Sequence, residues 1–526
     1  MGKETRRPAV DIARAIEHEL RLTGEAETLQ AVFNSQPLAS RSDGAAEVDL
    51  VNRYVDTPDH RLHTRGLALR IRKDARGCRQ TLKAGDDAHG ALLKRGEWEV
   101  PLDEDRLDLD ALPKPARRLI VKTVSEGDLT TAFETTYRRR TRRLTVDGPD
   151  GRAEIEAALD LGVIEAEGAS LPIAEIELEL LEGELASLYD LALELQDGAP
   201  LRIETRSKSN RAFSAITGKA PAWHKATTPD ITPDDTVDQA MAAIFESCFA
   251  QWLANQAAAV DGRDPEGVHQ MRVGLRRLRS TLSIFKKLIP KRELDWLRAD
   301  ARQTADYLGP ARDWDVFLND LLAPVMHAQP EDRELSTLCA RAKTRRAAAY
   351  RALRKNLLGA PYNRFLLRFG AWLEGRAWRQ ARSQKQAALG ELPVTAFTSE
   401  LLSTRQGKAL QQGEGFADLP VGKRHALRIA LKKLRYALEF FAPLFQKTAV
   451  KPFVGSLKTL QNDLGHLNDV AVARTLLDDL TAKPGKTDLR RAAGMVIGWH
   501  ARGVADLEPK LIRDWSAFAR RSPFWA

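Results

Sequence analysis

The sequence predicts an α+β multidomain protein with a strand-rich first half and a helical second half. In the first half, apolar and ionised residues alternate over short segments such as 174–180, which is the period of a half-buried strand. In the second half, Ala, Leu, Arg and Lys recur at helical spacing over long segments, including 341–358, 364–381 and 423–441. A chain of 526 residues can bury more than one core, so at least two domains are expected.

Three segments of the first half carry the strand pattern. Glu17, Glu19 and Arg21 share one face of a strand, while Leu69–Arg72 presents only guanidiniums on its polar face and Ala174–Leu180 only carboxylates. An antiparallel sheet with a solvated face gives the same alternation, and Glu17 with Arg21 would also pair in a helix. Charge identity argues against the solvated face, because carboxylates along one strand face repel unless cations face them. The alternative is that the ionised faces turn inward on a closed barrel.

An interior of this kind has a definite chemistry. Carboxylates bind hard divalent cations, and Arg and Lys bind phosphates. Together they describe a polyphosphate site in which Mg²⁺ or Mn²⁺ bridges carboxylates and phosphate oxygens while water attacks a terminal phosphorus. The sequence contains no Gly-x-x-x-x-Gly-Lys-Ser/Thr loop and no His-Glu-x-x-His motif, so a P-loop NTPase and a zinc hydrolase are not supported.

The second half repeats itself at an offset of 156 residues. The segment His269–Arg279 returns as His425–Arg435, and Gly309 returns as Gly465. At about 100° per residue, the basic side chains of each copy form a stripe beside an apolar strip. A solvated helix face would explain one such stripe, although like charges at this spacing cost stability unless anions face them. Two matching stripes favour a polyanion-binding site.

The strand-rich and helical halves of the chain also differ in net charge. Residues 1–220 contain 33 Lys and Arg against 40 Asp and Glu, a net charge of −7, and the remainder carries 48 against 32, a net charge of +16. The basic half suits polyanions such as polyphosphate, nucleic acid or an anionic membrane. The acidic half argues against a nucleic-acid binder throughout.

Residues 218–236 contain three prolines and little periodicity, which predicts a linker that closes at a helix N-cap near Asp234–Thr236. We therefore expect a domain over 1–217, the linker, and a helical domain over 237–526 with repeats of about 237–390 and 391–526. The three cysteines show no paired spacing, and no uncharged apolar run approaches about 18 residues. A cytoplasmic protein without a membrane partner is expected.

Read together, the motifs of the first half resemble a CYTH domain, the triphosphate tunnel metalloenzyme fold. They occur in the family's order, with Arg21 in place of the signature Lys: Glu17-His-Glu19-Leu-Arg21, Tyr54-Val-Asp56-Thr57-Pro58-Asp59, Leu69-Arg70-Ile71-Arg72, Gln80-Thr81-Leu82-Lys83, Arg95-Gly-Glu97-Trp98-Glu99, Ile155-Glu156-Ala-Ala-Leu-Asp160, Glu175-Ile-Glu177-Leu-Glu179 and Lys208-Ser209. The resemblance implies an eight-stranded antiparallel tunnel, with flanking helices, that binds triphosphate together with Mg²⁺ or Mn²⁺.

The resemblance also implies roles for individual residues. The carboxylates it places at the metal are Glu17, Glu19, Glu156, Asp160, Glu175, Glu177 and Glu179. The cations it places on triphosphate are Arg21, Arg70, Arg72, Lys83, Arg95, Arg139 and Lys208. Glu17, Glu19 and Lys83 are the implied catalytic residues.

The helical half resembles a CHAD domain, which implies polyphosphate binding by the two stripes. Their residues are His269, Arg272, Arg276, Arg277, Arg279, His425, Arg428, Lys432, Lys433 and Arg435. The combined resemblance implies a metal-dependent hydrolase that cleaves inorganic triphosphate to phosphate and pyrophosphate, with a polyphosphate-binding domain that would associate it with polyphosphate granules. A polyphosphate-docking protein with little catalysis, or a tunnel enzyme for another organic triphosphate, remain alternatives. Specific nucleic-acid binding is not expected.

Overall fold

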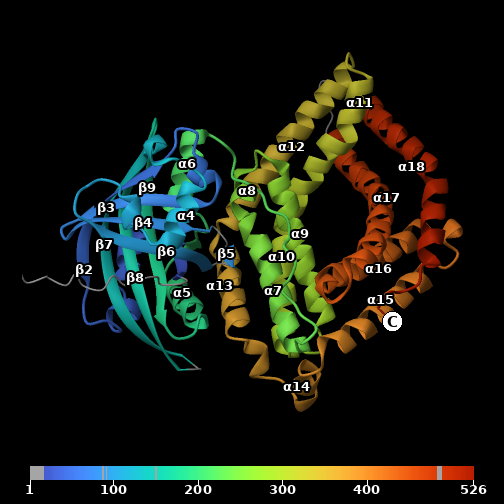
Figure 1. Ribbon diagram of the computed structural model, residues 1–526. Coiled ribbons are helices and arrows are strands. Elements are labelled where there is room, and N and C mark those ends of the chain that lie inside the picture. The colour runs from blue at the N-terminus through green and yellow to red at the C-terminus, as the bar shows by residue number, and fades with distance from the viewer. Residues whose placement is uncertain (1–16, 86–87, 90–91, 149–150, 483–487, 526) are drawn as a thin grey trace, which may run out of the picture. The chain divides into compact units, whose positions relative to one another are not determined.

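The computed structural model describes residues 17–85, 88–89, 92–148, 151–482 and 488–525. The chain forms two compact units (Figure 1). The tunnel unit comprises the described residues up to Ala222 together with Leu358–Ala377, and the helical unit comprises Trp223–Leu357 and the described residues from Trp378 onward. The predicted combination of an antiparallel β-tunnel with a helical region is confirmed.

Eight antiparallel strands close the tunnel. In chain order they are β1 (Glu17–Thr23), β2 (Ala46–Asp56), β3 (Leu67–Asp74), β4 (Gly77–Ala84), β6 (Leu92–Leu102), β7 (Thr130–Gly148), β8 (Gly151–Ala166) and β9 (Ala169–Glu182). Neighbours follow the order β1-β9-β8-β7-β2-β3-β4-β6, and β6 pairs again with β1. The short strands β5 (Ala88–His89) and β10 (Arg202–Ile203) pair with β6 and β1. The segment Glu17–Thr23 is therefore a strand, and the helical alternative for Glu17 and Arg21 is wrong.

Alternation gives the tunnel an ionised interior and an apolar exterior. Ile176 and Leu178 of β9 are fully buried on the opposite strand face from Glu175 and Glu177. On another side of the barrel, strand residues such as Leu82 pack with α4 (Lys114–Val121) in one apolar cluster. Burying each such side chain stabilises the fold by about 1.5–3 kcal/mol. The outward apolar faces therefore hold the helices and leave the inward faces for charged residues.

Helices cover the outside of the tunnel. Those of the tunnel unit are α1 (Ala26–Phe33), α2 (Gln36–Ala39), α3 (Arg61–Thr64), α4, α5 (Ala186–Gly198), α6 (Lys208–Thr217) and α13 (Ala360–Glu374). Although α13 follows more than a hundred residues of the helical unit in sequence, it packs on α5 (Figure 1). Asn363 of α13 accepts a hydrogen bond from the backbone N–H of Ile203 at 3.0 Å, and Gly370 leaves room for the ring of Tyr189.

The helix predicted over Arg364–Ala381 is not continuous. It ends at Glu374, and a short 3-10 turn, η4 (Ala377–Arg379), follows. Between them Gly375 ends the helix and Arg376 has a φ of 47°, which is left-handed backbone. This break separates the last residues of the tunnel unit from those that return to the helical unit.

The helical unit contains two series of helices that begin at matching offsets. The first is α7 (Val237–Ala254), α8 (Gln256–Asp261), α9 (Pro265–Ile284), α10 (Lys291–Val316), α11 (Ala323–Ala328) and α12 (Arg333–Leu357). The second is α14 (Gln384–Gly390), α15 (Val394–Gln412), α16 (Val421–Phe440), α17 (Lys447–Thr481) and α18 (Arg490–Ala519). The starts of α9 and α10 return 156 residues later as those of α16 and α17. Thr236 caps α7 in a capping box, within the predicted N-cap segment.

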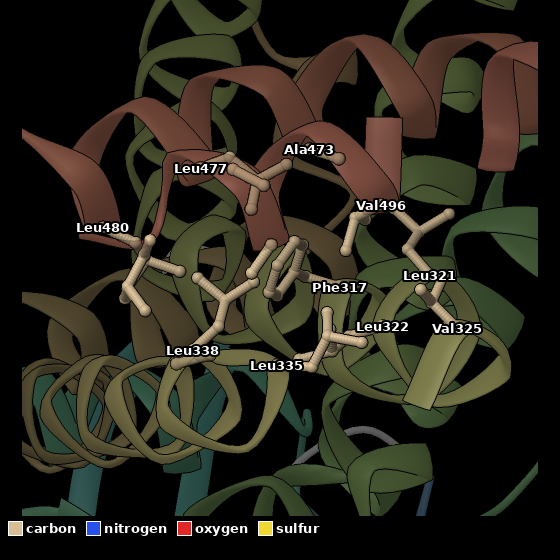
Figure 2. Close-up of a cluster of buried hydrophobic side chains, with 14 of the residues drawn as sticks. Phe317, Leu321, Leu322, Val325, Leu335, Leu338, Ala473, Leu477, Leu480 and Val496 are labelled. Atoms are coloured by element: carbon tan, nitrogen blue, oxygen red, sulfur yellow. The ribbon is translucent and has the colours of Figure 1, made fainter. Parts of the chain in front are cut away.

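Both series contribute to one apolar core of the helical unit. Figure 2 shows Phe317, Leu321 and Leu322, from a π-helical turn after α10, against residues of α17 and α18 such as Leu477 and Val496. These side chains are almost completely buried. The two copies therefore fold as one unit. Among the described residues, no helix has both the length and the hydropathy required to cross a membrane.

Candidate functional site

The tunnel encloses a cavity of about 710 Å³ that is lined mainly by charged side chains. Strand register explains how they meet. Glu19 of β1 lies opposite Glu179 of β9, which lies opposite Glu156 of β8 on its other side. These three carboxylates, which we call the Glu19 row, thus cross three neighbouring strands, and all three line the cavity. Glu19 is almost completely buried and accepts a hydrogen bond from Arg21 at 2.5 Å.

A second group of carboxylates lies further along the same strands. Asp160, Glu175 and Glu177, which we call the Asp160 cluster, place one oxygen each within 4.8 Å of one another. Asp160 and Glu175 are completely buried, and of the three only Glu177 lines the cavity. Among the described carboxylates of this wall, the Glu19 row and Glu177 therefore line the cavity.

Four cations surround the Asp160 cluster. The ammonium of Lys208 lies 2.7 Å from Asp160 Oδ2 and 2.8 Å from Glu177 Oε1, and it also contacts Glu175. Arg139 donates two hydrogen bonds of 2.7 Å to Asp160 and a third to Glu177. The other two cations are Arg21, 3.2 Å from Glu177, and Arg211, 2.8 Å from Glu175.

These ion pairs shift the pKa values of Glu177 and Lys208. Burial alone would raise the pKa of Glu177, but Lys208, Arg139 and Arg21 outweigh it and hold that pKa well below its usual range. Burial alone would lower the pKa of Lys208, but the carboxylates of the cluster, led by Asp160, raise it well above its usual range. The Glu177 carboxylate and the Lys208 ammonium therefore hold each other in their charged forms.

A cationic wall comes from β3 and β4. Arg70, Arg72 and Lys83 line the cavity there, beside Glu97 of β6. Lys83 lies 3.0 Å from Glu97, and Arg70 lies 3.9 Å from it. The guanidinium of Arg72 is held by a hydrogen bond of 2.9 Å from Nε to Asn52 Oδ1. These three cations line the cavity and can therefore meet a phosphate there.

Helix α6 positions Lys208. The hydroxyl of Ser207 caps its first turn by accepting from the N–H of Asn210 at 3.0 Å. Further along, Phe213 stacks on His63 with ring centroids 4.1 Å apart, within a cluster that also buries residues of β2 and β7. This packing fixes the helix against the barrel, so that Lys208, Ser209 and Asn210 line the cavity.

Most of the tunnel residues predicted from the sequence lie together. Those that line the cavity are Glu19, Arg21, Arg70, Arg72, Lys83, Arg139, Glu156, Glu177, Glu179 and Lys208. Asp160 and Glu175 lie behind them in ion pairs with Lys208. The backbones of Glu17 and Arg95 pair in the strands β1 and β6, but their side chains lie outside the described residues.

The structure adds cavity residues that the sequence analysis missed. Arg143 of β7 pairs in register with Glu156, and Tyr54, Tyr137, Glu97 and Glu99 also line the cavity. A sequence signal for Arg143 existed, because it follows Arg139 by four residues on one strand and therefore shares its face.

In the helical unit, the two basic stripes lie on α9 and α16, which pack against each other. Arg272 donates to the carbonyl oxygen of Gly309 at 3.0 Å and lies 3.9 Å from Asp313. A Cβ on Gly309 would lie 3.6 Å from the Arg272 guanidinium, and one on the duplicated Gly465 would lie 3.3 Å from that of Arg428. The Arg272 and Arg428 guanidiniums therefore lie over equivalent glycines, and the approach is tighter than ordinary contact only at Gly465.

Like charges of the two stripes face one another. Burial, followed by the charges of Arg428, Arg276 and Arg435, lowers the pKa of Lys432 to about 7. Arg276 of the first copy therefore lowers the pKa of Lys432 in the second copy.

Burial, followed by Arg312, Arg276 and Arg272, lowers the pKa of His269 to about 4. Arg312 of α10 is a further cation at this surface that the sequence analysis did not identify. We call His269, Arg272, Arg276, Arg312, Arg428, Lys432 and Arg435 the basic face.

Arg277 differs from the other stripe residues. It is 4% exposed and donates to Gln251 at 2.8 Å and to Ser247 at 3.2 Å, with Phe440 under its guanidinium at 5.1 Å. Its charge is therefore engaged inside the bundle. The remaining predicted stripe residues, Arg279, His425 and Lys433, are exposed.

A closed antiparallel tunnel lined by carboxylates and by Arg and Lys, joined to a duplicated helical unit, is the architecture that the sequence motifs predicted. Comparison with known families agrees, since residues 15–213 match the CYTH domain and residues 243–478 match the CHAD domain. The chain is thus a protein that joins a CYTH domain to a CHAD domain.

Individual relatives match the chain over different lengths. An uncharacterised protein of Mycobacterium tuberculosis is 27% identical over 504 residues, which cover 90% of each chain. The inorganic triphosphatase of Haemophilus influenzae is 30% identical over 167 residues, which cover 31% of this chain and 45% of that protein. The crystal structure of the CHAD domain from the plant Ricinus communis covers 57% of this chain and 98% of its own, with 28% identity and a TM-score of 0.49.

Proposed function

We propose that the tunnel unit hydrolyses inorganic triphosphate to phosphate and pyrophosphate with Mg²⁺ or Mn²⁺, and that the helical unit binds polyphosphate. One observation carries the proposal: the same cavity of about 710 Å³ is lined by the carboxylates of the Glu19 row and by Arg70, Arg72 and Lys83. A triphosphate and its divalent cation need this combination. The Haemophilus influenzae relative, whose name is inorganic triphosphatase, supports the substrate.

The Glu19 row suits the metal ion. Its three carboxylates come from neighbouring strands, line the cavity and include a side chain, Glu19, that is only 5% exposed. Carboxylate oxygens are the ligands that Mg²⁺ and Mn²⁺ prefer. A bound divalent cation would polarise phosphoryl oxygens and neutralise part of their charge.

The chain's own residues supply the rest of the chemistry. Arg70, Arg72 and Lys83 would bind the phosphoryl oxygens, with Lys83 exchanging its ion pair with Glu97 for one with phosphate. Asn52 keeps Arg72 oriented before substrate arrives, so little reorganisation is required. Hydrolysis breaks the bond between the terminal phosphorus and its bridging oxygen, water adds to phosphorus, and pyrophosphate leaves.

The basic face suits a long polyanion. Its cations come from both copies of the duplication, and burial, followed by neighbouring cations, lowers the pKa of Lys432 there. Successive phosphates of a polyphosphate chain would supply opposing charge. Association with polyphosphate granules would follow from this binding.

Phosphate release from inorganic triphosphate, ATP and long polyphosphate, with Mg²⁺, Mn²⁺ or chelator, tests the proposal. Fast, metal-dependent cleavage of inorganic triphosphate is the expected result. Cleavage of ATP in preference would instead identify an enzyme for organic triphosphates. No turnover with retained polyphosphate binding would make the protein a docking module, an outcome that the engagement of Arg21, Arg139 and Lys208 in ion pairs would explain.

A further inference from the structure

Arg72 differs from the other predicted triphosphate ligands of the cavity in the kind of partner that it has. The ligands that form an ion pair with at least one carboxylate are Arg21, Arg70, Lys83, Arg139 and Lys208. Within the part of the chain that the structure describes, Arg72 forms no ion pair with a carboxylate. Its guanidinium instead donates from Nε to the neutral side chain of Asn52, at 2.9 Å from Oδ1.

Asn52 is fixed from its other side by Thr135. Strand register places Asn52 of β2 between Arg72 of β3 and Thr135 of β7. Asn52 and Thr135 are completely buried, and Asn52 Nδ2 donates to Thr135 Oγ1 at 3.0 Å. A guanidinium can only donate, so it takes the amide oxygen and leaves the amide nitrogen for an acceptor, which the Thr135 hydroxyl supplies. The three side chains therefore form one chain of hydrogen bonds that ends at the cavity.

This arrangement orients a cation without neutralising it. Asn52 holds Arg72 at Nε, which leaves the two terminal nitrogens of the guanidinium for a phosphate that can bind both of them. An aspartate at position 52 could accept the same hydrogen bond, but its negative charge would offset that of Arg72 and compete with the phosphate. A neutral acceptor therefore gives the guanidinium its direction and preserves its charge for a ligand.

We propose that Asn52, held by Thr135, is a positioning residue that directs the Arg72 guanidinium at triphosphate without pairing it with a carboxylate, and that it thereby sets the affinity of the tunnel for this anion. The inference rests on the proposed function and deepens it, because it makes a neutral side chain a determinant of triphosphate binding. A purely structural role, in which Asn52 only links β2 to its neighbours, would be served equally well by an aspartate.

Asn52→Asp separates these two roles, because it keeps the size and the acceptor of the side chain and adds a negative charge. KM for inorganic triphosphate should rise about 10- to 100-fold with a much smaller change in kcat, since a charged hydrogen bond to the substrate is weakened. Calorimetry with inorganic triphosphate and chelator measures binding without turnover and should show a loss of affinity of similar size. A folded Asn52→Asp protein with the wild-type KM and affinity would overturn the inference.

Asn34→Asp is the matched control. Asn34 is exposed at the C-cap of α1, and its Oδ1 accepts a hydrogen bond from Arg140 at 3.1 Å. Because Arg140 and Arg139 are consecutive residues of β7, their side chains point to opposite faces of the strand, and Arg139 is the one that lines the cavity. The control thus places the same charge beside an arginine outside the cavity, and KM should keep its wild-type value. An equal rise of KM in both variants would assign the effect to net charge and contradict the inference.

Variants of Thr135 provide the test if Asn52→Asp does not fold. Thr135→Val keeps the shape of the side chain and removes the acceptor of the Asn52 amide, so KM should rise at least threefold, whereas Thr135→Ser should keep the wild-type value. The wild-type KM in Thr135→Val would count against the inference.

Binding and turnover distinguish this inference from the proposed function. If the wild type binds inorganic triphosphate without cleaving it, and Asn52→Asp weakens that binding, the inference is supported and the proposed hydrolysis fails. A wild-type protein that binds no inorganic triphosphate would contradict both.

Discussion

The tunnel and the basic face use the same kinds of charged residue in opposite ways. In the tunnel each carboxylate of the Asp160 cluster meets Arg or Lys at hydrogen-bonding distance, and the pKa of Lys208 rises. On the basic face cations from two helices approach one another, and the pKa of Lys432 falls to about 7. The tunnel thus pairs its charges before any ligand arrives, whereas burial and neighbouring cations both disfavour the charged form of Lys432 on the basic face.

The largest expected effect concerns the tunnel alone. Glu19→Gln with Glu179→Gln removes two carboxylates of the Glu19 row while keeping their size. Metal-dependent turnover of triphosphate should fall about 10²–10³-fold, because the cation would lose its ligands. Steady-state phosphate release measures this. Polyphosphate affinity should stay unchanged, and turnover at the wild-type rate would show that the row does not hold the metal.

Charge reversal on the basic face should give the converse result. Arg276→Glu with Lys432→Glu places two carboxylates where the two stripes meet, so polyphosphate affinity should fall about 100-fold. Fluorescence anisotropy with labelled polyphosphate is a suitable measurement. Lys343→Glu with Lys355→Glu, on exposed positions of α12, makes the same change in net charge and should have a much smaller effect. Equal losses of polyphosphate affinity in both double variants would show that net charge, and not the basic face, determines binding.

Titration of Lys432 should make polyphosphate binding depend on pH. Arg428 and Arg435 on its own helix and Arg276 on α9 accompany burial in lowering its pKa to about 7, and Asp469 on α17 opposes them. Bound phosphate would raise the pKa of this ammonium, so its contribution to binding is complete below about pH 7 and is lost as pH rises through the pKa of the complex.

Polyphosphate affinity should therefore decrease from about pH 7 to 9, by at most about tenfold per pH unit. Titrations across this range would show the slope, and Lys432→Arg should flatten it, since arginine stays charged. An identical slope in that variant would assign the effect to another group.

The smallest expected effect concerns stability. Asn363→Ala removes the buried acceptor for the N–H of Ile203, which should cost the tunnel unit about 1–3 kcal/mol. Hydrogen exchange should become faster in β10 and in its partner β1. Asn356→Ala, at a half-exposed position of α12, is the control. Unchanged exchange in β10 would mean that this hydrogen bond does not stabilise the strand.

Sequence periodicity was sufficient for much of the fold and the tunnel site. Alternation placed Glu175, Glu177 and Glu179 on one strand face, and the repeat placed His269 and His425 on equivalent helices. Both inferences are local, since they depend on spacing along one strand or one helix. The resemblance to the CYTH family supplied the closure of the sheet, which alternation alone left open.

Properties that depend on partners distant in sequence could not be predicted in this way. Spacing cannot show that Lys208 meets Asp160 across 48 residues, because tunnel register and the position of α6 decide it. Nor can spacing separate Arg277 from Arg276, since only the packing of α7 and α9 shows that Arg277 reaches Gln251. The position of α13 is a third case, because its apolar face would suit any neighbouring helix.

Helix α13 also changes what a cut in the chain would do. Because Leu358–Ala377 belongs to the tunnel unit, the backbone passes between the units near residues 222, 357 and 377. Proteolysis within the proline-containing segment 218–236 would therefore leave the tunnel with a helix that is still covalently part of the other fragment. The two fragments should copurify after such a cut and separate only in denaturant, because α13 of one fragment packs on the tunnel of the other.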